Sequence, residues 1–219
     1  VQHMGEHYQI PLPQDQGTGL GKPLKLINHP LREDIPIAIA SLGPKSVQMT
    51  AELADAWLPV FYTAEAAQQV WGDALKAGTA KRDASRPPLE VFAGGAVGIG
   101  EGLEDLRNLA RPQIALYVGG MGARSRNFYN QIFTKSGYGD AATEIQDLYL
   151  SGQKQAAEAA VPDEYLERNS LIGPQGFVKD RLYALKESGV TSLNVGFIGT
   201  TSDERVRNCE LLRNIIDTM

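Results

Sequence analysis

The residues best suited to bind a ligand are five consecutive ones, Ser41, Leu42, Gly43, Pro44 and Lys45. Gly43 lets a ligand approach the backbone closely, and Pro44 is typical of the first position of a helix, where its missing N–H group costs nothing. The N–H groups that open a helix lack intrahelical acceptors and favour an anion, by roughly 0.3–1 kcal/mol per charge. Lys45 adds a positive charge. The run therefore predicts a phosphate site, and its alternative interpretation is an ordinary turn beside a solvated lysine.

The neighbouring segments predict the elements that would position this turn. Residues 35–40 are β-branched and apolar, which is typical of a strand buried on both faces. Residues 45–54 show helical spacing, and residues 57–62 are a second short apolar run. Strand, turn, helix and strand form one unit of a parallel sheet, and such sheets bind ligands at the carboxyl ends of their strands.

Two further strands are predicted at residues 89–97 and 192–198. Gly94 and Gly95 stand near the carboxyl end of the first of these. Glycine inside a strand indicates either a bulge or a close approach of another backbone, and both remain open.

Helix boundaries are indicated by local signals. Thr63 is placed to cap a helix over residues 64–77, and Gly78 is its expected terminating residue. A helix over 175–188 is expected to end at Gly189, and Thr200 to Asp203 offer caps for a final helix.

The rest of the chain separates into a lead-in and an insertion within a single predicted domain of residues 1–219. Residues 1–34 are rich in Pro and Gly and predict a loop-rich lead-in, with a glycine loop at 17–21 and a short edge strand at 22–27. Residues 101–170 are helical in pattern without a clear strand, and we expect a helical insertion there, with Pro112 breaking its first helix. Arg124 and Arg126 in this insertion could meet an anionic group or could simply be solvated.

The number of predicted strands indicates the architecture. A complete (β/α)8 TIM barrel has eight strand–helix units and typically about 250 residues. This α/β chain of 219 residues shows four such units, so it resembles half of a barrel.

Composition narrows the function classes. The formal net charge of −5 argues against a nucleic-acid binder. The single cysteine, Cys209, excludes a disulfide framework and suits a reducing compartment, so we expect a cytoplasmic protein. No apolar run approaches the ~20 residues that span a bilayer, no signal peptide is visible, and the three histidines lack metal-ligand spacing. The chain does not start with Met, and we expect that further sequence precedes it.

Several segments resemble the bacterial-luciferase-like monooxygenase superfamily. Two of them are IPIAIASLGPKSVQMTAELADAWLP and SLIGPQGFVKDRLYALKESGVTSLNV. Within that superfamily the chain looks most like the oxidoreductases that depend on the deazaflavin coenzyme F420, through GEHYQIPLP, KPLKLINHP and ALYVGGMGAR. The resemblance covers nearly the whole chain but only the carboxyl-terminal portion of such an enzyme.

The resemblance implies a TIM-barrel enzyme whose cofactor phosphate contacts Ser41, Leu42, Gly43, Pro44 and Lys45, with Gly94 and Gly95 lining the same face. It implies hydride transfer between the deazaflavin and an organic substrate, a reaction in which the cofactor does the chemistry and the protein positions it. The family's acid and base residues lie on earlier strands, so the catalytic residues stay unassigned. One departure is Ala56, where the family usually has glycine.

Two other functions remain open. An FMN-dependent monooxygenase of the same fold would offer a phosphate to the same turn. A half-barrel without catalysis of its own would leave two unpaired sheet edges, which favour association with a second chain. We expect a small-molecule substrate and a homodimer.

Overall fold

The computed structural model describes residues 2–18, 21–23, 25, 27–32 and 34–219, and the chain forms two compact units, Val1–Ile35 and Pro36–Met219. In the first unit, strands β1 (His3–Met4) and β2 (Gln9–Ile10) form a short antiparallel hairpin in which His3 is opposite Ile10. None of its described residues is buried. Parts of two predicted features, at positions 19–20 of the glycine loop and 24 and 26 of the edge strand, lie outside the described residues.

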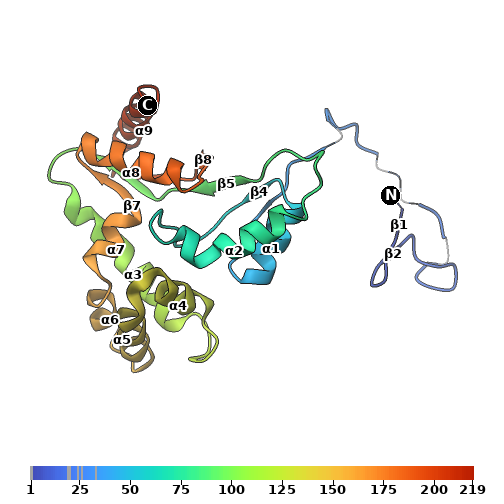
Figure 1. The fold of residues 1–219 in the computed structure, drawn as a ribbon, viewed down its shortest axis with the longest axis horizontal. Coiled ribbons are helices and arrows are strands. Elements are labelled where there is room, and N and C mark those ends of the chain that lie inside the picture. The colour runs from blue at the N-terminus through green and yellow to red at the C-terminus, as the bar shows by residue number, and fades with distance from the viewer. Residues whose placement is uncertain (1, 19–20, 24, 26, 33) are drawn as a thin grey trace. The chain divides into compact units, whose positions relative to one another are not determined.

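The second unit contains two parallel sheets, and two stretches of the chain run from one sheet into the other (Figure 1). The four-stranded sheet has the order β3-β4-β5-β8, and the three-stranded sheet has the order β7-β6-β9. The strands of the first are Ala38–Ile39, Ala56–Trp57, Glu90–Ala93 and Ser192–Leu193. Those of the second, in the order given, are Ser170–Gly173, Ala96–Ile99 and Gly196–Phe197. The chain passes directly from β5 to β6 and from β8 to β9, and in the described residues the sheets do not close into a barrel.

Gly94 and Gly95 form the break between β5 and β6. A Cβ atom on Gly94 would lie 2.5 Å from the carbonyl oxygen of Asn194, and one on Gly95 would lie 2.6 Å from that of Asn169. Neighbouring backbone therefore excludes a side chain at both positions, which is the close approach that the sequence left open. The predicted strands 89–97 and 192–198 are each two shorter strands as a consequence.

The sequence-based strand assignments need three corrections. The strand predicted at 57–62 is only β4, Ala56–Trp57. Strand β7 was not predicted, and only its first residue falls in the segment 101–170 that was expected to be helical, so five segments of chain contribute parallel strands to the second unit, where the sequence predicted four. Its four residues are buried throughout, and so short a run gives no periodic signal. The strand predicted at 35–40 is only β3, and it is not buried on both faces, since Ile35 and Ile37 are 68% and 61% exposed. This strand is also at the edge of the four-stranded sheet, where only β4 pairs with it.

Helices α1 (Pro44–Leu53) and α2 (Ala67–Thr79) lie side by side against this sheet (Figure 1). The boundaries predicted for α2 were wrong. Thr63 does not cap it with its side chain, because the helix begins at Ala67 and has no side-chain cap. Gly78 lies inside α2 and is buried against α1, where a Cβ would overlap the carbonyl oxygen of Gln48.

The segment between β6 and β7 is built of short helices, as its pattern predicted. A 3-10 turn, Glu104–Ala110, leads into α3 (Arg111–Ala115) and a π-turn, Leu116–Gly120, and Pro112 stands in the first turn of α3. The remaining helices are α4 (Phe128–Phe133), a π-turn at Thr134–Tyr138, α5 (Gly139–Leu150), α6 (Lys154–Ala159) and α7 (Asp163–Arg168).

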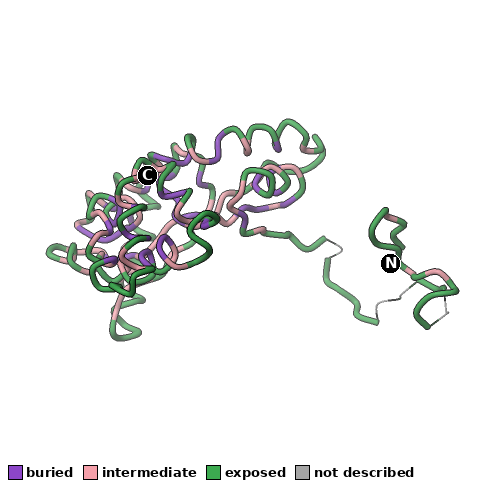
Figure 2. Tube along the Cα trace, turned by 90° about the horizontal axis from the view of Figure 1, so that it is seen from below, coloured by how far each residue is buried: buried purple, intermediate pink, exposed green. Residues whose placement is uncertain are grey.

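The last two helices match their predictions closely. Helix α8 (Gln175–Glu187) ends just before Gly189, which has a φ of +101°, and its buried residues are Val178, Leu182 and Leu185. Helix α9 (Ser202–Ile216) begins with a reciprocal capping box between Thr201 and Glu204. Buried residues lie along the strands and on the helix faces that pack against them (Figure 2).

Candidate functional site

The predicted anion-binding turn connects β3 to α1. Gly43 is the N-cap residue of α1, with an extended backbone (φ −73°, ψ 150°), and its carbonyl oxygen accepts the first helical bond from the Val47 N–H at 2.9 Å. Pro44 is the first helical residue, as predicted, and Lys45 is exposed. The turn thus stands at the carboxyl end of a parallel strand.

Two tryptophan side chains hold the peptide groups of this turn. Trp57 on β4 donates its indole N–H to the carbonyl oxygen of Ser41 at 3.0 Å, and Trp71 on α2 donates to that of Leu42 at 3.2 Å. Both indoles are buried, at 0% and 2% exposure. The two carbonyls therefore point into the core. In a planar trans peptide the N–H of the next residue points the opposite way, so the N–H groups of Leu42 and Gly43 point away from the indoles.

The turn offers four donors without an acceptor. Among the described residues, the backbone N–H groups of Leu42, Gly43, Lys45 and Ser46 make no hydrogen bond. The last two belong to the first turn of α1, where the helix dipole adds positive character. A concentration of unpaired N–H groups beside a lysine fits a phosphate.

The hydroxyl of Ser41 is not one of these donors. Thr50 donates its only hydroxyl proton to the carbonyl oxygen of Ser46 at 2.8 Å. The Oγ of Ser41 lies 2.8 Å from Thr50 Oγ1, and it is the donor of this bond when Thr50 donates to Ser46. We therefore interpret the Ser41 side chain as a group that orders the turn.

Ser46 is a candidate that sequence reasoning missed. Its hydroxyl donates to the carbonyl oxygen of Gly43 over 3.3 Å, a long bond at an exposed position, and it stands next to the unpaired N–H groups. A serine three residues into a helix gives no distinctive sequence signal. Only the geometry shows that the Ser46 hydroxyl is accessible, whereas the Ser41 hydroxyl is buried in a hydrogen bond with Thr50.

An aromatic ring from the helical segment adjoins the turn. A Cβ built on Gly43 would lie 3.8 Å from Cε1 of Phe128, which is 58% exposed. Of the two arginines that precede this ring, Arg124 forms an ion pair with Asp147, whereas Arg126 is exposed and has no ion pair with any described residue. No signal in the sequence places this segment beside the turn.

Gly94 and Gly95 line a different cavity, of about 190 Å³. Its wall also includes Phe92, Asn169 and Asn194, and none of residues 41–45 contributes to it. The structure therefore does not bring the two predicted groups of cofactor residues into one cavity. A larger cavity, of about 630 Å³, lies at the carboxyl ends of β6 and β9, where Ile99, Leu103, Leu106 and Ile198 make much of its wall apolar.

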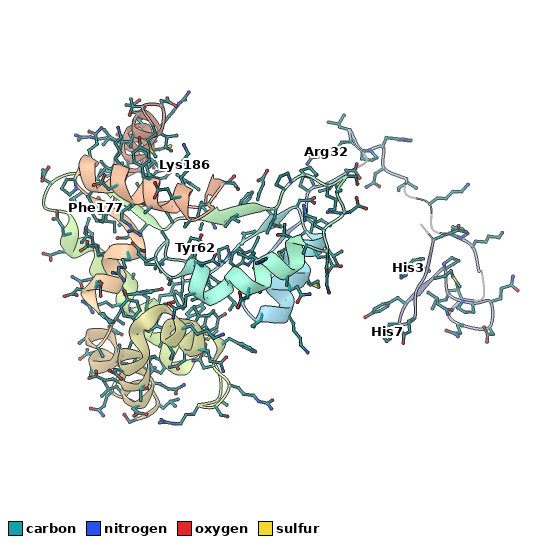
Figure 3. The ribbon with its side chains drawn as sticks, in the orientation of Figure 1. His3, His7, Arg32, Tyr62, Phe177 and Lys186 are labelled. Atoms are coloured by element: carbon teal, nitrogen blue, oxygen red, sulfur yellow. The ribbon has the colours of Figure 1, made fainter. Side chains whose placement is uncertain are left out.

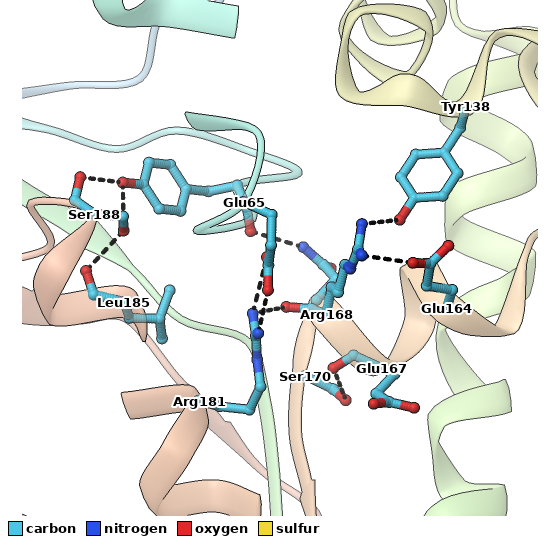
Figure 4. Close-up of polar contacts among 11 residues, drawn as sticks. Glu65, Tyr138, Glu164, Glu167, Arg168, Ser170, Arg181, Leu185 and Ser188 are labelled. Carbon is cyan, nitrogen blue, oxygen red and sulfur yellow. Dashed lines mark hydrogen bonds and ion pairs between the residues drawn. The ribbon is translucent and has the colours of Figure 1, made fainter. Parts of the chain in front are cut away.

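A group of charged side chains links the segment just before α2 to α7 and α8 without offering an obvious acid or base (Figure 4). Arg181 pairs with Glu65 and also donates to the carbonyl oxygen of Arg168 at 2.8 Å. Burial acts to raise the pKa of Glu65, but the hydrogen bond from Arg181, a backbone hydrogen bond and the charges of Arg181 and Arg168 together outweigh it, and the pKa lies below its ordinary value. Arg168 donates to the hydroxyl of Tyr138 at 3.1 Å and pairs with Glu164. Since these charges are paired with one another, we interpret the group as structural.

The aromatic core beneath the turn extends from Trp57 and Trp71 to Tyr62. The ring of Tyr62 stacks on Trp71 at a centroid distance of 5.9 Å. Its hydroxyl bonds to Ser188, 3.0 Å from both the carbonyl oxygen and the side-chain oxygen, and burial raises its pKa. Trp71 is thus part of the core.

Comparison with known proteins identifies the family. The model of the luciferase-like monooxygenase family matches residues 1–192. The chain belongs to this family. It is 36% identical to a putative coenzyme F420-dependent oxidoreductase of Mycobacterium tuberculosis, over 97% of this chain and 60% of that protein. It is 26% identical to the 5,10-methylenetetrahydromethanopterin reductase of Archaeoglobus fulgidus, over 74% of this chain and 48% of that protein. The chain thus spans about half to three-fifths of these luciferase-like relatives.

Solved structures show the same fold. The F420-dependent tetrahydromethanopterin reductase of Methanopyrus kandleri matches with a TM-score of 0.56 at 20% identity, over 81% of this chain and 49% of that one. An F420-dependent secondary alcohol dehydrogenase matches with a TM-score of 0.59 at 11% identity, over 99% of this chain and 56% of that one. The predicted α/β class of the TIM-barrel type is confirmed, and so is the predicted superfamily. In the described part of this luciferase-like chain, no helix is long and apolar enough to cross a membrane, and no three His, Cys, Asp or Glu side chains are grouped to hold a metal.

Proposed function

We propose that this chain is part of a coenzyme F420-dependent oxidoreductase and that the turn from Leu42 to Ser46 binds the phosphate of the deazaflavin. The observation that carries the proposal is the set of four unpaired N–H groups in the turn of a chain that is 36% identical to a putative F420-dependent oxidoreductase. When bound, the deazaflavin supplies the hydride chemistry. The residues of this chain bind and orient it.

Each residue of the turn has a distinct part in the proposed site. The N–H groups of Leu42, Gly43, Lys45 and Ser46 donate to the phosphate oxygens, and the Ser46 hydroxyl turns from the Gly43 carbonyl to join them. The Lys45 ammonium contributes charge without a fixed position, because its side chain is exposed. Gly43 keeps the backbone accessible and Pro44 starts the helix without adding a donor.

Fluorescence titration of the purified chain with F420, with FMN as the comparison, tests this function. We expect F420 to bind and Lys45→Ala to weaken its binding about two- to five-fold, as befits one exposed charge beside a helix terminus. The matched control is Lys186→Ala, which removes an exposed lysine from α8 (Figure 3) and should leave the affinity unchanged. The difference between the two variants should shrink at high salt, because exposed charges are screened.

The other outcomes select between the remaining functions. Tighter binding of FMN than of F420 would favour the FMN-dependent monooxygenase, since both cofactors carry a phosphate. Binding of neither would contradict the proposal and favour a non-catalytic half-barrel, for which the open edge of β3 is the supporting observation. We also propose that the protein is a homodimer acting on a small organic substrate, and light scattering of the purified protein measures the first of these.

A further inference from the structure

The indole donors of Trp57 and Trp71 meet consecutive peptide groups of the same turn. Their acceptors are the carbonyl oxygens of Ser41 and Leu42, at 3.0 and 3.2 Å. The two rings pack edge to face, with centroids 5.3 Å apart and an angle of 77° between their planes. Ordinary packing of two tryptophans requires neither that both N–H groups face one turn nor that they bond to adjacent carbonyls.

These two bonds fix which way the peptide planes face. Without a donor below it, each carbonyl could rotate outward to water, and its peptide would then turn the following N–H inward. An inward N–H at Leu42 or Gly43 would be lost to a ligand. A carbonyl oxygen facing outward would also repel an anion at the same place. Each indole N–H thus keeps one backbone N–H facing a ligand and one carbonyl oxygen turned away from it.

We propose that Trp57 and Trp71 are positioning residues for the anion-binding turn, holding two carbonyls inward so that the N–H groups of Leu42 and Gly43 face a bound phosphate. The inference rests on the proposed function of that turn. It assigns a role to two side chains that touch no ligand themselves.

The rigidity of the surroundings supports this role. Trp57 is fully buried on β4, and Trp71 is stacked on Tyr62 with only 4° between the ring planes. The donors therefore have little freedom to follow a carbonyl that rotates away, and the peptide must conform to them.

The test compares three variants in their affinity for F420 and for the same cofactor without its phosphate. Trp57→Phe and Trp71→Phe keep an aromatic ring in the core but replace the indole by the smaller phenyl group, which has no N–H donor. Tyr62→Phe is the matched control, because it removes one hydrogen bond from the same aromatic group but none from the turn. Each variant is titrated with F420 and with the same deazaflavin riboside lacking the phosphate, and its folding is checked by thermal unfolding.

We expect Trp57→Phe and Trp71→Phe each to weaken F420 binding by roughly three- to ten-fold, in line with one hydrogen bond, and to leave the phosphate-free riboside unaffected. Tyr62→Phe should lower thermal stability by a similar amount and change neither affinity. Either tryptophan variant is sufficient for the test, so if one variant misfolds, the other can still be measured.

Three results would overturn the inference alone. The first is wild-type F420 affinity in the folded tryptophan variants. The second is an equal loss of affinity for both ligands, and the third is an equal loss of affinity in Tyr62→Phe, since a general disturbance of the core does not distinguish the phosphate. Failure of the wild-type chain to bind F420 at all would instead refute the proposed function, and the inference with it.

Discussion

Replacing Gly78 by alanine tests the contact that places the helix of the proposed site. Gly78 lies inside α2 and faces α1 without a side chain between them. A Cβ at this position would overlap the carbonyl oxygen of Gln48 and would lie 2.7 Å from the Cβ of Ala51 and 3.0 Å from the carbonyl carbon of Gln48. Since two of these neighbours are backbone atoms, no side-chain rotation can relieve the overlap. Helix α1 must move as a body, and it carries the turn from Leu42 to Lys45 at its start.

Two opposing effects set the size of the change. Alanine is a better helix former than glycine by about 1 kcal/mol in a helix interior. Overpacking a tight contact costs typically about 1–3 kcal/mol, and values near the upper end apply where backbone atoms obstruct the new methyl group. We therefore expect Gly78→Ala to lower the free energy of unfolding by about 1–2 kcal/mol and to weaken F420 binding as the turn shifts.

Urea unfolding of this variant is compared with that of Gly176→Ala. Gly176 is also helical, in the first turn of α8, but a Cβ there meets nothing within 4 Å. The same substitution should thus be neutral or stabilising by up to about 1 kcal/mol at Gly176. Equal effects at the two positions, or a gain in stability at Gly78, would refute the close contact between α1 and α2.

Two further predictions concern stability away from the cofactor. The Ile37 N–H donates to the Asp55 carboxylate at 2.8 Å, and this bond, with Arg86 at 3.1 Å, holds the pKa of Asp55 below its ordinary value. The resulting stabilisation is present above the pKa of the unfolded state and is lost as the pH falls through the lower pKa of the folded state. Between pH 7 and pH 3, urea unfolding should therefore show a smaller loss of unfolding free energy in Asp55→Asn than in the wild type. Thr201→Ala removes the side-chain acceptor for the Glu204 N–H at the start of α9 and should lower the free energy of unfolding by about 1 kcal/mol, whereas Ser202→Ala, one residue later, should have a smaller effect in the same urea experiment.

Local signals predicted the ends of three helices, one of which carries the proposed site. Pro44 marked the start of α1, Gly189 the end of α8 and Thr201 the cap of α9, and in each case the physical cause lies within a few residues of the signal. The family was predictable from longer segments of sequence, because the match to the family extends along most of the chain.

Features that depend on distant neighbours were not predictable in this way. Gly78 has the sequence context of a helix end, yet its lack of a side chain serves the contact with α1. Strand β7 carries no period in its four buried residues. The choice between the hydroxyls of Ser41 and Ser46 depends on where Thr50 donates its proton, and the orientation of the turn depends on indoles 16 and 29 residues further along the chain.

The most direct test of the proposed phosphate site is the backbone amide spectrum of the 15N-labelled protein during titration with F420. We expect the amide signals of Leu42, Gly43, Lys45 and Ser46 to shift together and more than those of Gly94 and Gly95, and we expect inorganic phosphate at high concentration to move the same four signals. Binding of F420 that leaves these four amides unmoved while signals elsewhere shift would contradict this expectation, because the phosphate would then lie outside the turn between β3 and α1.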